Sequence, residues 1–259
     1  KRSKVLQFDC NGLKSPCIKW AESITDLEAA FSIVHDEYLK LGYLKQRDAS
    51  GLYFGIHNLL PDTATLIVKS DSKVVATLTQ VQDTTDFGLP MDSIYESELN
   101  QLRRKGRKIA ELCGLVTSRP LRWKNLFMQM SRVMYTHALC CGVDDFCIMV
   151  NPKHVDFYKM IFLFDELAPE KFYPHLGVPA VALRADLKNM KSRLEEAYGS
   201  LDCDCNLYTY MHTPTGRHSV PWEDDLMQPE PVSPKVLAHF GIEEYLDQGQ
   251  NLPVAAAHA

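Results

Sequence analysis

The segment 108-KIAELCGLVTS-118 decides the fold class, because it has the pattern of a strand at the centre of a sheet. It is largely apolar on both faces, it contains one acid, Glu111, and Pro120 follows it. An apolar helix over 123–142 and a second buried strand, 145-DFCIMV-150, come next. A strand, a crossover helix and a second strand predict parallel neighbours in an α/β sheet.

The segments before this unit predict an antiparallel start to the same sheet. A short strand is expected over 17-CIKWA-21, and apolar residues at helical spacing predict a helix from about 25 to 41. The β-branched runs 63–70 and 74–83 predict a hairpin. A further helix is expected over 93–106.

Downstream, the pattern predicts one more helix and one more strand. Pro152 opens a helix over 153–164, and 178-VPAVALRADL-187 is predicted as a strand that follows a Pro-rich loop. Because helices and strands alternate in this half, its strands are expected to be parallel. We predict a domain over 15–188 and an extension over 189–259, which begins with a charged helix.

The composition describes a globular chain and excludes several classes of function. Of the 259 residues, 46% are hydrophobic and 24% charged, and the net charge of −5 is a poor match for nucleic acid. No apolar run reaches the roughly 20 residues that span a bilayer. The eight cysteines include no C-x-x-C pair, which favours a reducing cytoplasm. The C-x-C…H-x5-H pattern of 203–218 differs from zinc-site spacing, so no metal is expected.

Three features together resemble the GCN5-related N-acetyltransferase (GNAT) superfamily. They are the element order, the acid inside the central strand, and Asn151 followed seven residues later by Tyr158. The Gly-Phe pair that follows this Tyr in the superfamily is absent, and 159-KMIFLF-164 stands in its place. The resemblance implies a GNAT-like α/β fold, with helices flanking a mixed sheet that splays between strands 4 and 5, here followed by a C-terminal extension.

Over roughly residues 17–187 the chain is more closely similar to the N-acyl amino acid synthases of the FeeM type. The strings GLPMD and LRRKGR and the AEL strand carry this resemblance. The matching stretches are 61-PDTATLIVKSDSKVVATLTQVQDT-84, 88-GLPMDSIYESELNQLRRKGRKIAELCGL-115, 149-MVNPKHVDFYK-159 and 177-GVPAVALRADL-187. The resemblance implies transfer of a long-chain fatty acyl group from acyl carrier protein to the α-amine of an amino acid. The phosphopantetheine arm of the carrier protein would hold the donor, with no other cofactor.

Glu111 is the predicted general base. An α-amine is mostly ammonium at neutral pH, so aminolysis of a thioester requires a proton acceptor. A carboxyl group on a buried strand is costly unless it is used or paired, and burial raises its pKa toward neutrality. The alternative is a structural Glu paired with a basic residue of 103–108.

The superfamily resemblance implies two further roles near Glu111. Backbone N–H groups of Leu112, Cys113 or Gly114 would receive the thioester carbonyl at a bulge, and Tyr158 would protonate the departing thiolate. A packing glycine and a half-buried tyrosine are the alternatives. Cys113 also raises the possibility of an acyl-cysteine intermediate, but direct transfer is simpler.

The region 118-SRPLRWKN-125 lacks the glycines of the superfamily's CoA-binding loop, which favours a carrier protein as donor. Carrier proteins are acidic, and four basic residues are predicted to bind the carrier protein and its arm: Arg119, Arg122, Lys124 and Arg132. A solvated helix start is the alternative. An acyl-chain pocket is predicted at Phe127, Met130, Met134, Phe157 and Ile161, although ordinary core packing explains such residues too. We expect the C-terminal extension to cover the cleft as a lid.

Three other functions remain open from the sequence. The first is a CoA-dependent acetyltransferase acting on a small amine. The second is an acyl-homoserine lactone synthase, whose E-L-S-R pattern reads 111-ELCG-114 here, with Gly114 in place of the Arg. The third is a non-catalytic domain that binds a lipid or a carrier protein.

Overall fold

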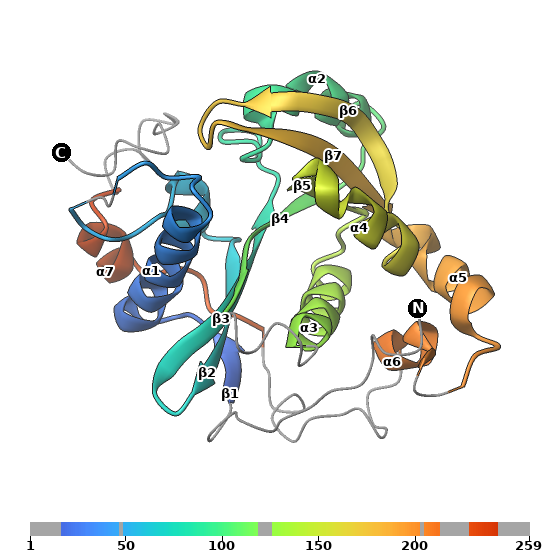
Figure 1. The fold of residues 1–259 in the computed structure, drawn as a ribbon, viewed down its shortest axis with the longest axis horizontal. Helices are drawn as coiled ribbons and strands as arrows, with labels where there is room; N and C mark the ends of the chain where they lie inside the picture. The colour runs from blue at the N-terminus through green and yellow to red at the C-terminus, as the bar shows by residue number, and fades with distance from the viewer. Residues whose placement is uncertain (1–16, 47–48, 119–125, 203–204, 213–227, 243–259) are drawn as a thin grey trace.

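The computed structural model describes residues 17–46, 49–118, 126–202, 205–212 and 228–242 (Figure 1). Seven strands within these residues form one mixed sheet in the order β1-β2-β3-β4-β5-β7-β6. The strands are β1 (Cys17–Trp20), β2 (Ala64–Ser70), β3 (Lys73–Gln82), β4 (Ile109–Thr117), β5 (Asp145–Val150), β6 (Asp165–Tyr173) and β7 (Val178–Asp186).

Helices cover both faces of the sheet (Figure 1). One face packs against α1 (Ile24–Lys40), the short helix η2 (Ile56–Leu59), α2 (Asp92–Arg103) and α7 (Pro234–His239). The other face packs against α3 (Leu126–Cys140), α4 (Val155–Ile161), α5 (Leu187–Tyr198) and α6 (Leu207–His212). The turn η4 (Pro152–His154) leads from β5 into α4. No helix in the described part of the chain is long and apolar enough to cross a membrane.

The parallel pair β4–β5 is short and then opens. The two strands pair at Ile109–Asp145, Ala110–Phe146 and Glu111–Cys147 only. Beyond Glu111, β4 continues beside β3, whereas β5 continues beside β7. The sheet therefore splays between β4 and β5, as the GNAT resemblance implies.

A cluster of ion pairs lies at the end where β4 and β5 are still paired, which we call the closed end. Asp145, at the start of β5, is fully buried, and its carboxylate receives Nε of Arg107 at 2.5 Å and Nε of Arg184 at 2.7 Å. Arg107 also pairs with Asp186 at the end of β7 at 2.6 Å. Charge-assisted bonds of this length around a buried carboxylate tie β5, β7 and the segment just before β4 together at one point.

Most predicted elements are confirmed close to their expected bounds, including the hairpin and the strands over 108–118 and 145–150. The prediction of a loop after residue 164 is wrong, because this stretch forms the edge strand β6. Pro169 lies where the register of β6 shifts, and an edge strand tolerates both proline and charge, so the stretch lacks the usual strand pattern. As a result β7 runs antiparallel to β5, not parallel as expected.

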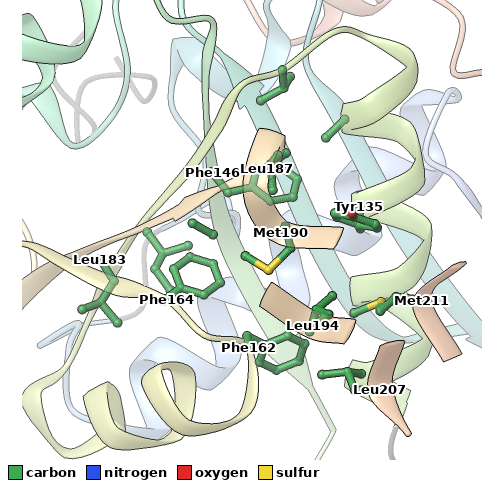
Figure 2. Close-up of a cluster of buried hydrophobic side chains, with 14 of the residues drawn as sticks. Tyr135, Phe146, Phe162, Phe164, Leu183, Leu187, Met190, Leu194, Leu207 and Met211 are labelled. Atoms are coloured by element: carbon green, nitrogen blue, oxygen red, sulfur yellow. The ribbon is translucent and has the colours of Figure 1, made fainter. Parts of the chain in front are cut away.

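The extension predicted after residue 188 packs onto the same core. Helix α5 starts at Leu187, directly after β7, and the side chain of Asp186 caps it by accepting the Lys188 N–H. Figure 2 shows Met190 and Leu194 of α5 among side chains of α3, β5 and β7. Near the other edge of the sheet, Phe240 packs its ring against Phe31 of α1.

Replacing Arg107 by Met should lower the free energy of unfolding by about 3 kcal/mol, because it leaves Asp145 buried with Arg184 as its remaining partner. Arg193→Met is the matched control, since it removes an exposed pair with Asp165 worth about 1 kcal/mol or less. Urea unfolding of both variants measures the difference. Equal losses would show that the cluster does not hold the strands.

Candidate active site

A cavity of about 740 Å³ lies where β4 and β5 part, and its lining residues come from both faces of the sheet. On the face of α1 and α2, tyrosines line it: Tyr38, Tyr53 and Tyr173. On the face of α3 to α6, the lining is apolar and aromatic: Phe127, Phe146, Ile148, Phe162, Leu187, Met190, Leu194 and Met211. The cavity therefore joins a tyrosine-rich chamber to an apolar chamber through the open sheet.

Glu111 lies at the point where the strands separate. It forms the last parallel pair, with Cys147, and its side chain is 1% exposed. Its Oε2 accepts the backbone N–H of Met91 at 2.8 Å. Burial raises the pKa of Glu111 to about 8; the negative charge of Asp92 adds to the rise, and the Met91 hydrogen bond opposes it.

Glu111 does not form the ion pair with a basic residue of 103–108 that was the alternative to a catalytic role. Within the described residues its carboxyl group forms no ion pair. Arg103 instead binds Asp83 and Asp92, and Arg107 binds Asp145. Glu111 is therefore a buried carboxyl group that borders the cavity without a cationic partner.

A β-bulge shapes the backbone next to Glu111. Thr77 of β3 pairs with Val116 and Thr79 pairs with Cys113, so β4 has one extra residue between them. Gly114 takes a φ of +60° there, a conformation that a side chain disfavours. Because β5 no longer pairs with β4 beyond Glu111, backbone groups of Leu112 to Gly114 that point toward β5 face the cavity. The bulge expected at Gly114 is present.

Tyr158 lines the apolar chamber from α4. Its ring packs against Phe127 at a centroid distance of 6.2 Å and against Phe164 at 5.8 Å. Burial raises its pKa to about 12, so the hydroxyl is protonated at neutral pH and can donate a proton. Glu111 and Tyr158 thus border the same cavity from different elements.

Cys113 borders the cavity as a neutral thiol. Burial raises its pKa, and the charge of Glu111 raises it further. A thiol is a weak nucleophile compared with a thiolate. This environment favours direct transfer over an acyl-cysteine intermediate.

The tyrosine-rich chamber was not predicted from the sequence. Tyr38 and Tyr53 lie 5.0 Å apart between ring centroids, and burial raises the pKa of both, as it does for Tyr173. All three hydroxyls are therefore neutral. The helical spacing of Tyr38 predicts a residue of the hydrophobic core, and Tyr53 and Tyr173 lie in stretches predicted as loops. No sequence pattern therefore identified these three residues as part of a cavity.

The predicted acyl-chain residues fall into two groups. Phe127 and Phe157 line the cavity, whereas Ile161 packs against the neighbouring core. Met130 and Met134 are fully buried against β2 and β3. Helix periodicity explains the division, because the face of α3 that includes Phe127, Ser131 and Tyr135 borders the cavity, and the adjacent face packs on the sheet.

Of the four basic residues predicted to bind the carrier protein, the structure describes only Arg132. Arg119, Arg122 and Lys124 lie outside the described residues. Arg132 is 8% exposed, and its guanidinium lies 5.3 Å from the centre of the Tyr210 ring, so it packs inside the molecule and does not extend an exposed patch.

Comparison with known proteins identifies the family of this chain. The profile of "N-acyl amino acid synthase FeeM" matches residues 29–186. The chain belongs to the FeeM family of N-acyl amino acid synthases. It is an acyltransferase with a GNAT-like fold, and no match was found among curated proteins.

Solved structures agree on the fold. The structure of FeeM, an N-acyl amino acid synthase from uncultured soil microbes, is 24% identical with a TM-score of 0.61 and covers 69% of this chain and 95% of its own. BjaI, a CoA-dependent acyl-homoserine lactone synthase, is 14% identical with a TM-score of 0.55 and covers 86% and 97%. TofI, solved with an inhibitor and MTA, is 11% identical with a TM-score of 0.52 and covers 66% and 91%.

The raised pKa of Glu111 predicts a pH-dependent stability. Between the ordinary value of 4.5 and about 8, the folded chain retains a proton that the unfolded chain releases, so the free energy of unfolding falls as pH rises through this window. The slope from one group is at most about 1.4 kcal/mol per pH unit. Glu111→Gln, whose amide oxygen can still accept the Met91 N–H, should remove this component.

Urea unfolding of both proteins from pH 5 to pH 9 measures the difference. The wild-type stability minus that of Glu111→Gln should decrease as pH rises and become constant above about pH 8. A difference that does not change with pH would mean that Glu111 has an ordinary pKa.

Proposed function

We propose that this enzyme transfers a long-chain fatty acyl group from an acyl-carrier-protein thioester to the α-amine of an amino acid. The observation that carries the proposal is the position of Glu111 at the junction of the two chambers, as a buried carboxyl group to which no described residue supplies a cationic partner. Membership of the FeeM family supports the reaction class. Both the carrier-protein donor and the amino acid acceptor are part of the proposal.

The proposed reaction places the acceptor in the tyrosine-rich chamber and the acyl chain in the apolar chamber. The acceptor reacts as the neutral amine, after its ammonium proton has passed to solvent. Its nitrogen attacks the thioester carbonyl carbon, and Glu111, in its ionised form, removes a second proton from that nitrogen. Backbone N–H groups of residues 112–114 donate hydrogen bonds to the oxygen that becomes negative. The new C–N bond remains when the C–S bond breaks.

Tyr158 completes the proton balance. Its hydroxyl donates a proton to the departing thiolate, so the carrier leaves as a free thiol. Solvent then carries the proton held by Glu111 to the tyrosinate of Tyr158, which restores both groups. Burial raises the pKa of Tyr158, which makes its hydroxyl a weaker acid than that of an ordinary tyrosine. A thiolate is a tolerable leaving group, so this contribution is expected to be smaller than that of Glu111.

The choice of a carrier protein over CoA rests on the sequence of residues 118–125, which has no glycine with which to build a phosphate-binding loop. The experiment is turnover by the purified full chain with the same acyl group on acyl carrier protein or on CoA. A mixture of amino acids is supplied, and products are identified by mass spectrometry. N-acyl amino acids from the carrier protein, and few or none from CoA, are expected.

Two other results would change the proposal. Equal turnover with acyl-CoA would reject the carrier-protein donor and keep the reaction. Folded protein that forms no N-acyl amino acid from either donor would reject the function itself.

Glu111→Gln should lower kcat/KM by roughly 10²–10⁴-fold, the usual contribution of a general base. In the wild type, kcat/KM should rise with pH and level off above about 8, because Glu111 must be ionised to accept a proton. Tyr158→Phe, the comparison variant, should lose less than roughly 100-fold. Steady-state rates from about pH 4 to pH 10 measure both effects. A profile that rises around pH 5 would exclude Glu111 as the base.

A further inference from the structure

We propose that helices α5 and α6 form a wall of the acyl chamber and determine the length of fatty chain that the enzyme accepts. The residues that meet the chain are Met190 and Leu194 of α5 and Met211 of α6. This inference rests on the proposed acyl transfer and names the part of the chain that sets its donor specificity.

The first support is the position of these residues in the cavity. Leu187, Met190 and Leu194 are three and four residues apart, so they form one stripe on α5 that lines the apolar chamber. Helix α6 packs against both α5 and α3, and Met211 lines the same chamber. Figure 2 shows Met190 between Phe162 and Phe164 on one side and Tyr135 of α3 on the other, with Met211 near Leu194 on the side of Tyr135.

The second support is that hydrogen bonds hold this wall in place. Tyr198, at the end of α5, donates its hydroxyl to the backbone carbonyl of Ile161 at 2.9 Å. The hydroxyl of Tyr135 lies 3.1 Å from Nε2 of His212, and Nδ1 of His212 lies 2.9 Å from the carbonyl of Tyr208. The Nδ1–H tautomer satisfies both contacts, with Tyr135 donating. A fixed wall can discriminate chain lengths, whereas a loose lid cannot.

The third support is where the family match ends. The FeeM profile stops at residue 186, one residue before α5, and the FeeM structure covers 69% of this chain. The residues for the chemistry, Glu111 and Tyr158, lie inside the match. The wall residues 190, 194 and 211 lie outside it, so the family profile does not account for the depth of the chamber. Described residues of the extension therefore line the pocket, and the lid expected from the sequence stays a prediction.

The apolar side chains of the wall suit the end of a saturated chain. A chain that is too long by one methylene meets Met190 or Met211, and a misfit of this size in a closed apolar pocket costs about tenfold in kcat/KM. Met190→Trp and Met211→Trp fill the space and should shift the preferred chain to shorter lengths. Met190→Ala and Leu194→Ala open the space and should shift it to longer lengths.

The test is a competition among acyl carrier proteins loaded with a graded series of even-numbered chains, mixed in equal amounts with the full-length enzyme. Mass spectrometry of the products gives the length distribution. The expected result is a change of about tenfold or more in the ratio of neighbouring lengths, with opposite directions for the Trp and Ala variants. Two controls should leave the distribution unchanged: Met160→Trp, on the exposed side of α4, and Met128→Ala, in the same core cluster but away from the cavity.

A second measurement separates this inference from the proposed function. Calorimetric titration with free fatty acids of graded length measures the preference of the chamber without turnover, and thermal melting confirms that each variant folds. If wild type makes no product but the variants still shift the fatty-acid preference, the proposed function fails and the wall assignment holds. If wild type makes product and the wall variants give the same length distribution as the controls, the wall assignment is overturned and the function stands.

Discussion

The separation of β4 from β5 is the constraint on which the rest of the structure depends. A central pair of parallel strands is normally bonded along its length, and here it is bonded at three positions and then opens. The closed end is held by the buried carboxylate of Asp145, which binds Arg107 and Arg184. The open end is shaped by the bulge at Gly114, where β4 stays with β3 and leaves its other edge unpaired. A strong ionic anchor at one end allows the backbone to remain unpaired at the other, where it can bind a substrate oxygen.

The same opening accounts for the chemistry of Glu111. Its side chain belongs to the last paired position, so it is enclosed by the sheet and by the start of α2, and it also borders the cavity. Burial without a cation brings its pKa close to neutral, whereas an ion pair with Arg103 or Arg107 would have lowered it. Those two arginines form ion pairs with other acids, so they do not lower the pKa of Glu111.

The parts of the site that sequence could predict are those with a local pattern. The central strand with its single acid, the parallel strand after it and the glycine suited to a bulge are all visible over a few residues. The chamber walls have no such pattern. Tyr53 and Tyr173 come from a loop and an edge strand, and Met190 and Met211 come from a charged helix and a short one, so only tertiary packing brings them together. Met130 and Met134 were predicted to line the acyl-chain pocket, but they pack in the core between α3 and the sheet. Their helical spacing shows that they share one face of α3, but not whether that face borders the cavity.

The residues proposed for the reaction and those proposed to select the chain length lie on different elements, and the second group comes after the last strand in the sequence. The residues proposed to handle protons and the thioester, Glu111 and Tyr158, lie on β4 and α4. The apolar wall comes from helices that start after the last strand and touch the chamber only with side chains. Leu187 is bonded through its backbone to Asp144 at the closed end, so we expect substitutions in that wall to change the volume of the chamber while β4 and β5 stay in place. The fold can therefore alter the length of its acyl donor while the geometry around Glu111 is unchanged.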